Sequence, residues 1–324
     1  MNQPSASVAR WAESALVLQG LELLGDFSLV RAMPWSQVWR LQTAQGDVFL
    51  KHMASLFGHE PRILHFLSEK LHAPVPEIIV DNPALQSFLM RDAGVPLRTL
   101  LLTDYQPALV VQALRACARI QQQAIPHIET LLQLGAMDWR LQRLPDLFVG
   151  LLDNQLLMTA EGISDAARAT FFSSVPHLRA ACDALTACGV PETLEHGDFH
   201  DNNIMLKNGA VIINDWGDAS ISHPFFSLSS LLESAGRNHK LLPDDARAAL
   251  FTAAYLECWA DFAPPAQLEK ALALAQIIRP VQFSINYSRL AQNAALQPAD
   301  YHAGWIAVCL RNFAESVKKP DCLR

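Results

Sequence analysis

The sequence predicts an α+β fold with two lobes. A small, mostly antiparallel β lobe with one main helix comes first, and a larger, mainly helical lobe carrying a β-hairpin follows. Short β-prone runs separated by turn residues occupy most of residues 27–90, whereas apolar residues at helical spacing dominate the remainder. The turn-rich residues 92–96 separate the two regions, so we expect lobes at residues 1–93 and 94–324.

The N-terminal lobe is expected to follow the order β-β-β-α-β-β. Its helix is predicted by Ile63, Leu64 and Leu67, which share one face at helical spacing, and by Pro61, which suits a first turn. The strands are short runs rich in β-prone residues. The expected elements are strands at residues 27–33, 36–42 and 47–52, a helix at 60–71, and strands at 77–80 and 85–90.

The C-terminal lobe is expected to be largely helical, because its apolar residues recur with the period of an amphipathic helix. A hairpin within residues 195–218 is the main interruption. The expected helices span residues 105–124, 126–134, 164–188, 243–262 and 266–293.

The hairpin is predicted by Asn208-Gly209, which lies between the β-prone runs 204–206 and 211–213. Asn-Gly between two such runs is the strongest local signal for a two-residue hairpin loop. With these residues in the loop, Leu206 pairs with Val211 and the strands end at the same edge. The register of the whole segment follows from the position of this turn.

This register brings Asn203 and Asp215 to the same end of the small sheet, with Asp198 in the preceding loop. An amide carbonyl and a carboxylate are ligands that Mg²⁺ accepts, often together with phosphates and water. Phosphoryl transfer to a hydroxyl also needs a carboxylate that orients the acceptor. The residue types and their spacing therefore indicate a site for this chemistry.

Two segments carry a resemblance to a known family. Residues 196–205 (HGDFHDNNIM) resemble the catalytic loop of the aminoglycoside phosphotransferase/choline kinase-like family, whose members share the two-lobed protein-kinase fold. Residues 213–218 (INDWGD) resemble its metal-binding segment. The resemblance implies that Asp198 orients the acceptor hydroxyl and takes its proton, and that Asn203 and Asp215 hold Mg²⁺.

The resemblance also implies an ATP site built from the N-terminal lobe. Lys51 matches the strand lysine that contacts the α- and β-phosphates, and Glu60 matches the helix glutamate that holds this lysine. Residues 88–92 match the hinge strand whose backbone binds the purine, so Met90 and Asp92 are expected beside the base. Lys51 alone also fits a solvated strand end, and Glu60 fits an acid at the start of a helix.

The chain departs from the family pattern at two places. Residues 31–37 (RAMPWSQ) occupy the position of the phosphate-covering loop but contain no glycine. Ser36 is expected to offer its hydroxyl and N–H there; an ordinary hairpin with Trp35 packed on the lobe is an equal alternative. Ser227 stands where many relatives have a buried Asp that braces the catalytic loop.

Three further side chains have open roles. Asp218 either reaches a second metal or caps the following segment. His196 and His200 have the spacing of a zinc pair, but that motif requires a helix and the intervening Gly197 disfavours one. We expect His196 to be a packed loop histidine, and His200 either to cap the loop or to contact substrate.

The composition of the chain argues against several classes of protein. The chain has 324 residues and a net charge of −7 without a basic cluster, which argues against nucleic acid as the main partner. No apolar run reaches the length of a membrane span, and residues 1–14 lack the order of a signal peptide. We expect a cytoplasmic monomer or homodimer. The cysteines lack metal-type spacing and are expected to be reduced; they are Cys117, Cys182, Cys188, Cys258, Cys309 and Cys322.

The expected function is an ATP- and Mg²⁺-dependent kinase that phosphorylates a hydroxyl of a small molecule, for example one that contains an amine or a sugar. The alternative is a pseudokinase-like nucleotide-binding or regulatory module. The sequence does not identify the acceptor, because one fold serves many acceptors. Acids and aromatic rings in the helical lobe are candidates to receive a cationic amine, but solvated acids and core rings explain them better. They are Glu233, Glu257, Asp261, Trp259, Tyr287, Tyr301 and Trp305.

Overall fold

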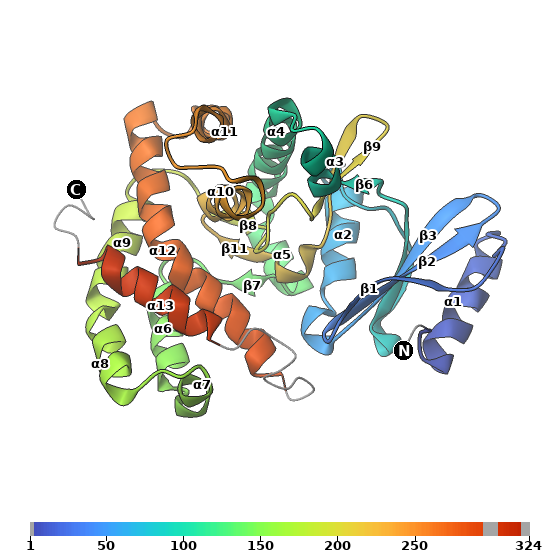
Figure 1. Ribbon diagram of the computed structural model, residues 1–324, viewed down its shortest axis with the longest axis horizontal. Helices are drawn as coiled ribbons and strands as arrows, with labels where there is room; N and C mark the ends of the chain where they lie inside the picture. The colour runs from blue at the N-terminus through green and yellow to red at the C-terminus, as the bar shows by residue number, and fades with distance from the viewer. Residues whose placement is uncertain (1–2, 294–303, 319–324) are drawn as a thin grey trace.

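The computed structural model describes residues 3–293 and 304–318. It confirms the mixed α+β architecture. Figure 1 shows the large β-sheet and the first helix at one end of the molecule and most of the helices at the other. Tyr301 and Cys322 lie outside the described residues. Within the described ranges the cysteines are free thiols, and no helix there has both the length and the apolar character that a membrane crossing requires.

The N-terminal sheet has the predicted order of elements. Its five strands are antiparallel and lie in the order β1-β2-β3-β5-β4. The helix α2 (Glu60–Glu69) falls between the third and fourth strands. The strands are β1 (Ser28–Met33), β2 (Ser36–Thr43), β3 (Gly46–Met53), β4 (Ile78–Asn82) and β5 (Ser87–Arg91).

One face of this sheet is covered by a helix that the sequence analysis missed. The helix α1 (Ala6–Leu18) begins at Ser5, whose side chain accepts a hydrogen bond from the N–H of Val8. Val8, Ala12 and Leu16 pack with the sheet in a separate hydrophobic cluster. These residues recur at helical spacing behind an N-cap serine, so the signal was present in the sequence.

The opposite face of the sheet meets the helical lobe through α2. Ile63, Leu64 and Leu67 of α2 are fully buried in the main core cluster, which continues through the helical lobe. The sheet therefore packs against α1 on one side, and on the other side α2 connects it to the core of the helical lobe.

Several expected helices differ from those found. The expected helix at 164–188 is two helices, α8 (Asp165–Ser173) and α9 (Val175–Thr186). Pro176 explains the break, because it lacks an N–H and its ring clashes with the preceding turn of a continuous helix. The expected helix at 126–134 begins only at Ile128, after a 3₁₀ turn. The expected helix at 243–262 is shorter: it starts after Asp245, whose side chain caps it, and it ends at Glu257.

The helical lobe also contains helices that were not expected individually. These are α3 (Leu97–Thr103), α6 (Leu144–Asp153), α7 (Gln155–Ala160), α10 (Phe225–His239) and α13 (Trp305–Ser316). The expected helices at 105–124, 126–134, 243–262 and 266–293 correspond to α4 (Pro107–Ala124), α5 (Ile128–Leu134), α11 (Ala246–Glu257) and α12 (Pro265–Ala291).

The hairpin has the predicted register. β9 (Ile204–Lys207) pairs with β10 (Ala210–Ile213), with Leu206 opposite Val211. Asn208 and Gly209 have φ values of 52° and 80°, as a type I′ turn requires. β6 (Val95–Pro96) adds a third strand. A second small sheet of β7 (Met137–Asp138), β11 (Ser220–Ser222) and β8 (Thr193–Glu195) was not predicted, since its strands are too short to show a pattern.

Candidate active site

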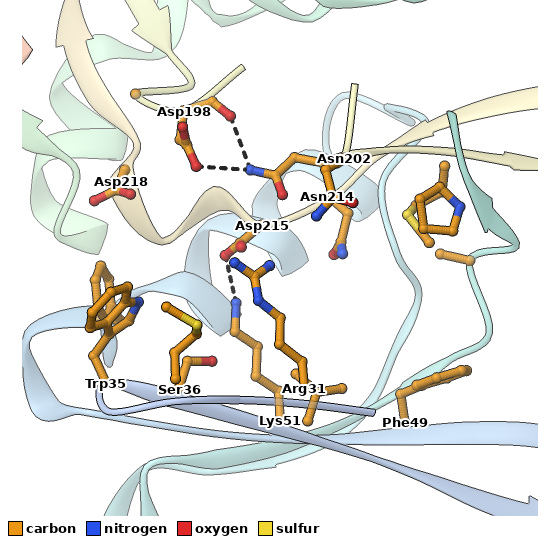
Figure 2. Close-up of a pocket in the computed structure, with 18 of the residues that line it drawn as sticks. Arg31, Trp35, Ser36, Phe49, Lys51, Asp198, Asn202, Asn214, Asp215 and Asp218 are labelled. Atoms are coloured by element: carbon orange, nitrogen blue, oxygen red, sulfur yellow. Dashed lines mark hydrogen bonds and ion pairs between the residues drawn. The ribbon is translucent and has the colours of Figure 1, made fainter. Parts of the chain in front are cut away.

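A cavity of about 580 Å³ lies between the N-terminal sheet and the helical lobe. It is lined by β1, β2 and β3, by the segment after β5, by the loop before the hairpin, and by α12. Figure 2 shows Arg31 and Lys51 extending from the sheet toward Asp215, with Ser36 on the sheet beside them and Asp198 on the opposite side. The predicted catalytic, nucleotide and metal residues are therefore brought to one place, with the exception of Glu60, which lies behind Lys51.

Asp198 is held by the side chain of Asn203. The Nδ2 atom of Asn203 donates to the backbone carbonyl of Asp198 at 3.0 Å and to its Oδ2 at 3.1 Å. Nε2 of His200 lies 3.2 Å from the same Oδ2. Removal from water would raise the pKa of Asp198, but the charge and hydrogen bond of His200, with Arg279 further away, hold it well below its usual value. The carboxylate therefore stays ionised at neutral pH and can accept a hydrogen bond from a hydroxyl.

The backbone before Asp198 depends on Gly197. Its φ of 83° is in the left-handed region, and a Cβ at this position would lie 2.3 Å from the carbonyl oxygen of Asp218. A side chain at residue 197 would therefore both strain the backbone and displace the segment that carries Asp218. The close approach brings the loop that carries Asp198 against the segment after the hairpin.

Asn203 and Asp215 meet as the hairpin predicts. The N–H of Asn214 donates to the carbonyl of Asn203 at 2.8 Å, which places Asp215 directly beside this pair. Asp215 adopts a left-handed conformation with φ 66° and ψ 65°, which is uncommon for a residue other than glycine. Burial alone would raise the pKa of Asp215, but Lys51 lowers it below its usual value.

The oxygen atoms of this pair fit a hard divalent cation. The hydrogen bonds from Asn203 use its Nδ2 atom and leave its amide oxygen for another partner. The ion pair of Asp215 uses Oδ1, so Oδ2 is outside that contact. One amide oxygen and one carboxylate oxygen are the small protein contribution that Mg²⁺ commonly takes. Elsewhere in residues 3–293 and 304–318, no cluster of three or more His, Cys, Asp or Glu offers a metal site.

Lys51 links the two lobes. Its Nζ atom donates to Oε1 of Glu60 at 2.8 Å and to Oδ1 of Asp215 at 2.7 Å. Burial alone would lower the pKa of Lys51, but the two carboxylates raise it above its usual value. The lysine therefore stays protonated, and Glu60 holds it in place as the sequence predicted.

The hinge residues line the cavity but differ in what they offer. Met90 pairs with Phe49 across the sheet and is almost fully buried at the cavity wall. Asp92 uses its carboxylate to accept the N–H of Gly94 at 2.9 Å, and its carbonyl accepts from Nζ of Lys207 at 2.6 Å. The side chain of Asp92 therefore shapes the turn between the lobes.

The glycine-free loop is a tight hairpin. Ser36 pairs with Met33, so the turn consists of Pro34 and Trp35. Ser36 and Trp35 both line the cavity, and Trp35 also packs against the main core. Both expectations for this loop are therefore compatible with the structure, because the packed tryptophan is itself part of the cavity wall.

Asp218 is paired with a residue that the sequence analysis missed. Nη1 of Arg289, from α12, lies 3.3 Å from Oδ1 of Asp218, and Nη2 donates to the carbonyl of Leu56 at 2.9 Å. Burial raises the pKa of Asp218 to about 6, and Arg289 offsets this only in part. Nothing in the local sequence pattern connects Arg289 to Asp218, since their contact depends on how α12 packs.

A buried glutamate supports the catalytic loop where Ser227 departs from the family pattern. Oε2 of Glu195 accepts the N–H of Gly197 at 2.9 Å, and Oε1 accepts from the hydroxyl of Ser227 at 2.9 Å. Glu195 is buried, which raises its pKa. This role was not predicted, because β8 is only three residues long (Thr193–Glu195) and its sequence gives no sign of the contacts of Glu195.

The two histidines do different things. Nε2 of His196 lies 2.9 Å from the carbonyl oxygen of Asn214, and its ring packs on Trp216 with centroids 4.7 Å apart. His200 instead contacts Asp198. His196 is thus a packed loop residue, and the two imidazoles do not face a common site.

The residues considered for a cationic acceptor are dispersed. Tyr287 lines the cavity, whereas Trp259 is fully buried among other rings and Glu257 pairs with Arg115 at the surface. Trp305 begins α13 away from the lining, and Glu233 and Asp261 are also absent from it. Most of these acids and aromatic residues are therefore surface carboxylates or core rings and do not form an acceptor site.

Comparison with known proteins agrees with the geometry. Residues 31–273 match the family described as "Phosphotransferase enzyme family", so more than half of the chain is covered. The chain belongs to this family and is a phosphotransferase. No curated protein sequence matches the chain significantly.

Solved structures share the fold at low sequence identity. A macrolide 2′-phosphotransferase type I is 12% identical with a TM-score of 0.60, covering 97% of this chain and 99% of that one. An ethanolamine kinase from Plasmodium vivax is 13% identical with a TM-score of 0.62, covering 91% and 82%. The APH(2″)-IIa protein, in a ternary complex with streptomycin and ATP, is 14% identical with a TM-score of 0.58, covering 91% and 98%.

Proposed function

We propose that this phosphotransferase moves the γ-phosphoryl group of ATP to a hydroxyl of a small molecule, with Mg²⁺ as cofactor. The single observation that supports this best is the convergence of Lys51, Asp215 and Asp198 on one cavity between the lobes. Residues 1–93 would bind the nucleotide, and residues 94–324 would supply the catalytic loop, the metal ligands and the acceptor site.

Asp198 is the group that meets the acceptor. Its ionised carboxylate orients the hydroxyl and takes the proton as the oxygen bonds to the γ-phosphorus, while the bond between the γ-phosphorus and the bridging oxygen breaks and ADP leaves. Because the transition state is loose, position and charge matter more than basicity. The two hydrogen bonds from Asn203 fix the position of this carboxylate.

The remaining groups hold the nucleotide. Lys51 places a positive charge at the phosphates, with Glu60 behind it. Asn203 and Asp215 would hold Mg²⁺, which when bound neutralises charge on the β- and γ-phosphate oxygens. Met90 and the segment up to Asp92 would receive the base, and Ser36 would cover the phosphates. The structural neighbour bound to streptomycin and ATP supports this choice of nucleotide.

The alternative is a nucleotide-binding module without turnover. The presence of an ionised Asp198, correctly held by Asn203, favours catalysis, since a binding module has no need for an acceptor carboxylate. We expect a soluble, cytoplasmic enzyme that acts as a monomer or homodimer on a small-molecule acceptor, with no role for nucleic acid or membrane.

Two measurements test this proposal in sequence. The melting temperature of the purified protein should rise with ATP and Mg²⁺ together, and less with either alone. ADP release should then be screened over aminoglycosides, amino alcohols, sugars and nucleosides, with heat-denatured protein as the control. Mg-ATP binding with no ADP release on any acceptor class would favour the binding module, and absence of Mg-ATP binding would contradict both.

A further inference from the structure

Arg31 lies in the same cross-strand row as the predicted phosphate lysine. Arg31 of β1 pairs with Val38 of β2, and Val38 pairs with Lys51 of β3. Residues in register on neighbouring antiparallel strands point to the same face of a sheet. Arg31 and Lys51 are therefore about 10 Å apart along the sheet and both line the cavity.

A β-bulge makes this placement possible. The pairing of β1 with β2 shifts between Leu29 and Arg31, which leaves Val30 as the extra residue. Leu29 packs against the cluster on the far face of the sheet, so strict alternation would send Arg31 to that face as well. The bulge instead turns Arg31 into the cavity, as bulges beside active sites often do.

The charge of Arg31 is not used by the rest of the described structure. No carboxylate in residues 3–293 or 304–318 forms an ion pair with its guanidinium. Lys51, in contrast, is offset by Glu60 and Asp215 together. Figure 2 shows the guanidinium of Arg31 beside Asp215, so its positive charge lies at the end of the cavity that carries the proposed metal ligands.

The covering loop itself supplies little to a phosphate. Its turn is Pro34-Trp35, and a proline has no N–H. A glycine-rich loop binds phosphate through closely approaching backbone N–H groups, which this hairpin does not present in that form. A guanidinium on the strand that leads into the turn provides two parallel donors and a fixed charge instead.

We propose that Arg31 is a nucleotide-binding residue that contacts the phosphate chain of ATP and replaces the backbone contacts of a glycine-rich loop. This rests on the proposed function, because the phosphate chain is that of its nucleotide. Figure 2 shows the guanidinium of Arg31 and the ammonium of Lys51 both directed toward Asp215.

The test is calorimetric titration of wild type, Arg31→Gln and Arg31→Lys with Mg-ATP and with adenosine. Arg31→Gln should weaken Mg-ATP binding by about 10- to 100-fold and leave adenosine binding within about two-fold, since charge-assisted hydrogen bonds to phosphate are lost. Arg31→Lys should recover part of the affinity. The matched control is Arg40→Gln, which makes the same charge change on β2 outside the cavity, where Arg40 pairs with Asp47 at 3.7 Å.

The outcomes separate this proposal from the proposed function. Wild-type protein that binds Mg-ATP, with an Arg31→Gln variant of unchanged affinity, would overturn the role of Arg31 alone. Equal weakening for adenosine, or an equal effect of Arg40→Gln, would also overturn it, because the effect would then not depend on a phosphate contact. Wild-type protein that binds no Mg-ATP would overturn the proposed function, and the role of Arg31 with it.

Discussion

The ammonium of Lys51 lies 2.7 Å from Oδ1 of Asp215, and these residues are 164 positions apart in the sequence. One stands on the N-terminal sheet and the other follows the hairpin of the helical lobe. Glu60, which is fully buried, shares the same ammonium. A single cation therefore balances two carboxylates at the junction of the lobes.

Removal of this cation is predicted to destabilise the fold. Lys51→Met should lower the free energy of unfolding by about 3–5 kcal/mol, because a buried carboxylate loses its partner. The double variant Lys51→Met/Glu60→Gln should recover most of that loss without recovering activity. Urea denaturation followed by circular dichroism measures both. A single variant as stable as wild type would show that the ion pair does not hold the lobes.

Glu195 is predicted to position the catalytic loop. Glu195→Ala leaves the buried N–H of Gly197 without an acceptor and should cost about 1–3 kcal/mol of stability. We expect kcat to fall at least about ten-fold with little change in the KM for ATP. Glu195→Gln, whose amide oxygen can still accept, should retain most activity. Ser227→Ala is the control that removes the neighbouring hydrogen bond and spares Gly197; an equal loss in both would contradict this role.

Gly197 and Gly209 form a matched pair for backbone substitution. Both have positive φ, 83° and 80°, but a Cβ at Gly197 would meet the backbone of Asp218, whereas one at Gly209 would meet nothing within 4 Å. Gly209→Ala should cost about 1–2 kcal/mol from the left-handed conformation alone. Gly197→Ala should cost more and should also abolish turnover. Thermal denaturation and an ADP-release assay measure the loss of stability and of activity in both variants. Equal losses in the two variants would contradict the close contact between residue 197 and the backbone of Asp218.

Asp218 is predicted to make stability depend on pH. Its pKa is about 6 in the folded protein, against 3.8 for an ordinary Asp. The folded state therefore binds the proton more tightly, so this contribution to stability is complete below about pH 4 and is lost as the pH rises through 6. The free energy of unfolding of Asp218→Asn minus that of wild type should increase by about 1–2 kcal/mol between pH 4 and 7.

Urea denaturation at pH 4, 5.5 and 7 measures this difference. Asp146→Asn removes a carboxylate that pairs with Arg179 at the surface, and it controls for the loss of one negative charge. A difference for Asp218→Asn that stays constant or decreases with pH would contradict the raised pKa.

The hairpin was predictable because its signal is local. Asn208-Gly209 determines the turn type, the turn determines the register, and the register brings Asn203 to Asp215. Lys51 and Glu60 followed from the order of short elements together with the resemblance. Two residues, Asn208 and Gly209, were therefore enough to predict the register of the hairpin.

The features that escaped the sequence analysis depend on packing or on exceptions to periodicity. The bulge at Val30 reverses the face of Arg31, and regular alternation cannot reveal such a change. Arg289 reaches Asp218 only because α12 lies across the cavity. In contrast, α1 and the break before Pro176 do have local signals, namely the N-cap residue Ser5 and the proline at the start of α9.

The central claim, that Asp198 orients the acceptor in an enzyme that uses Mg-ATP, is tested most directly by Asp198→Asn. Asn keeps the size of the side chain but can neither take the proton nor attract the hydroxyl with a charge. Acceptor-dependent ADP release should fall by about 10²- to 10⁴-fold, whereas the dissociation constant for Mg-ATP should stay within about three-fold of wild type, a change of roughly 0.7 kcal/mol. Turnover equal to that of wild type in this variant would contradict the account.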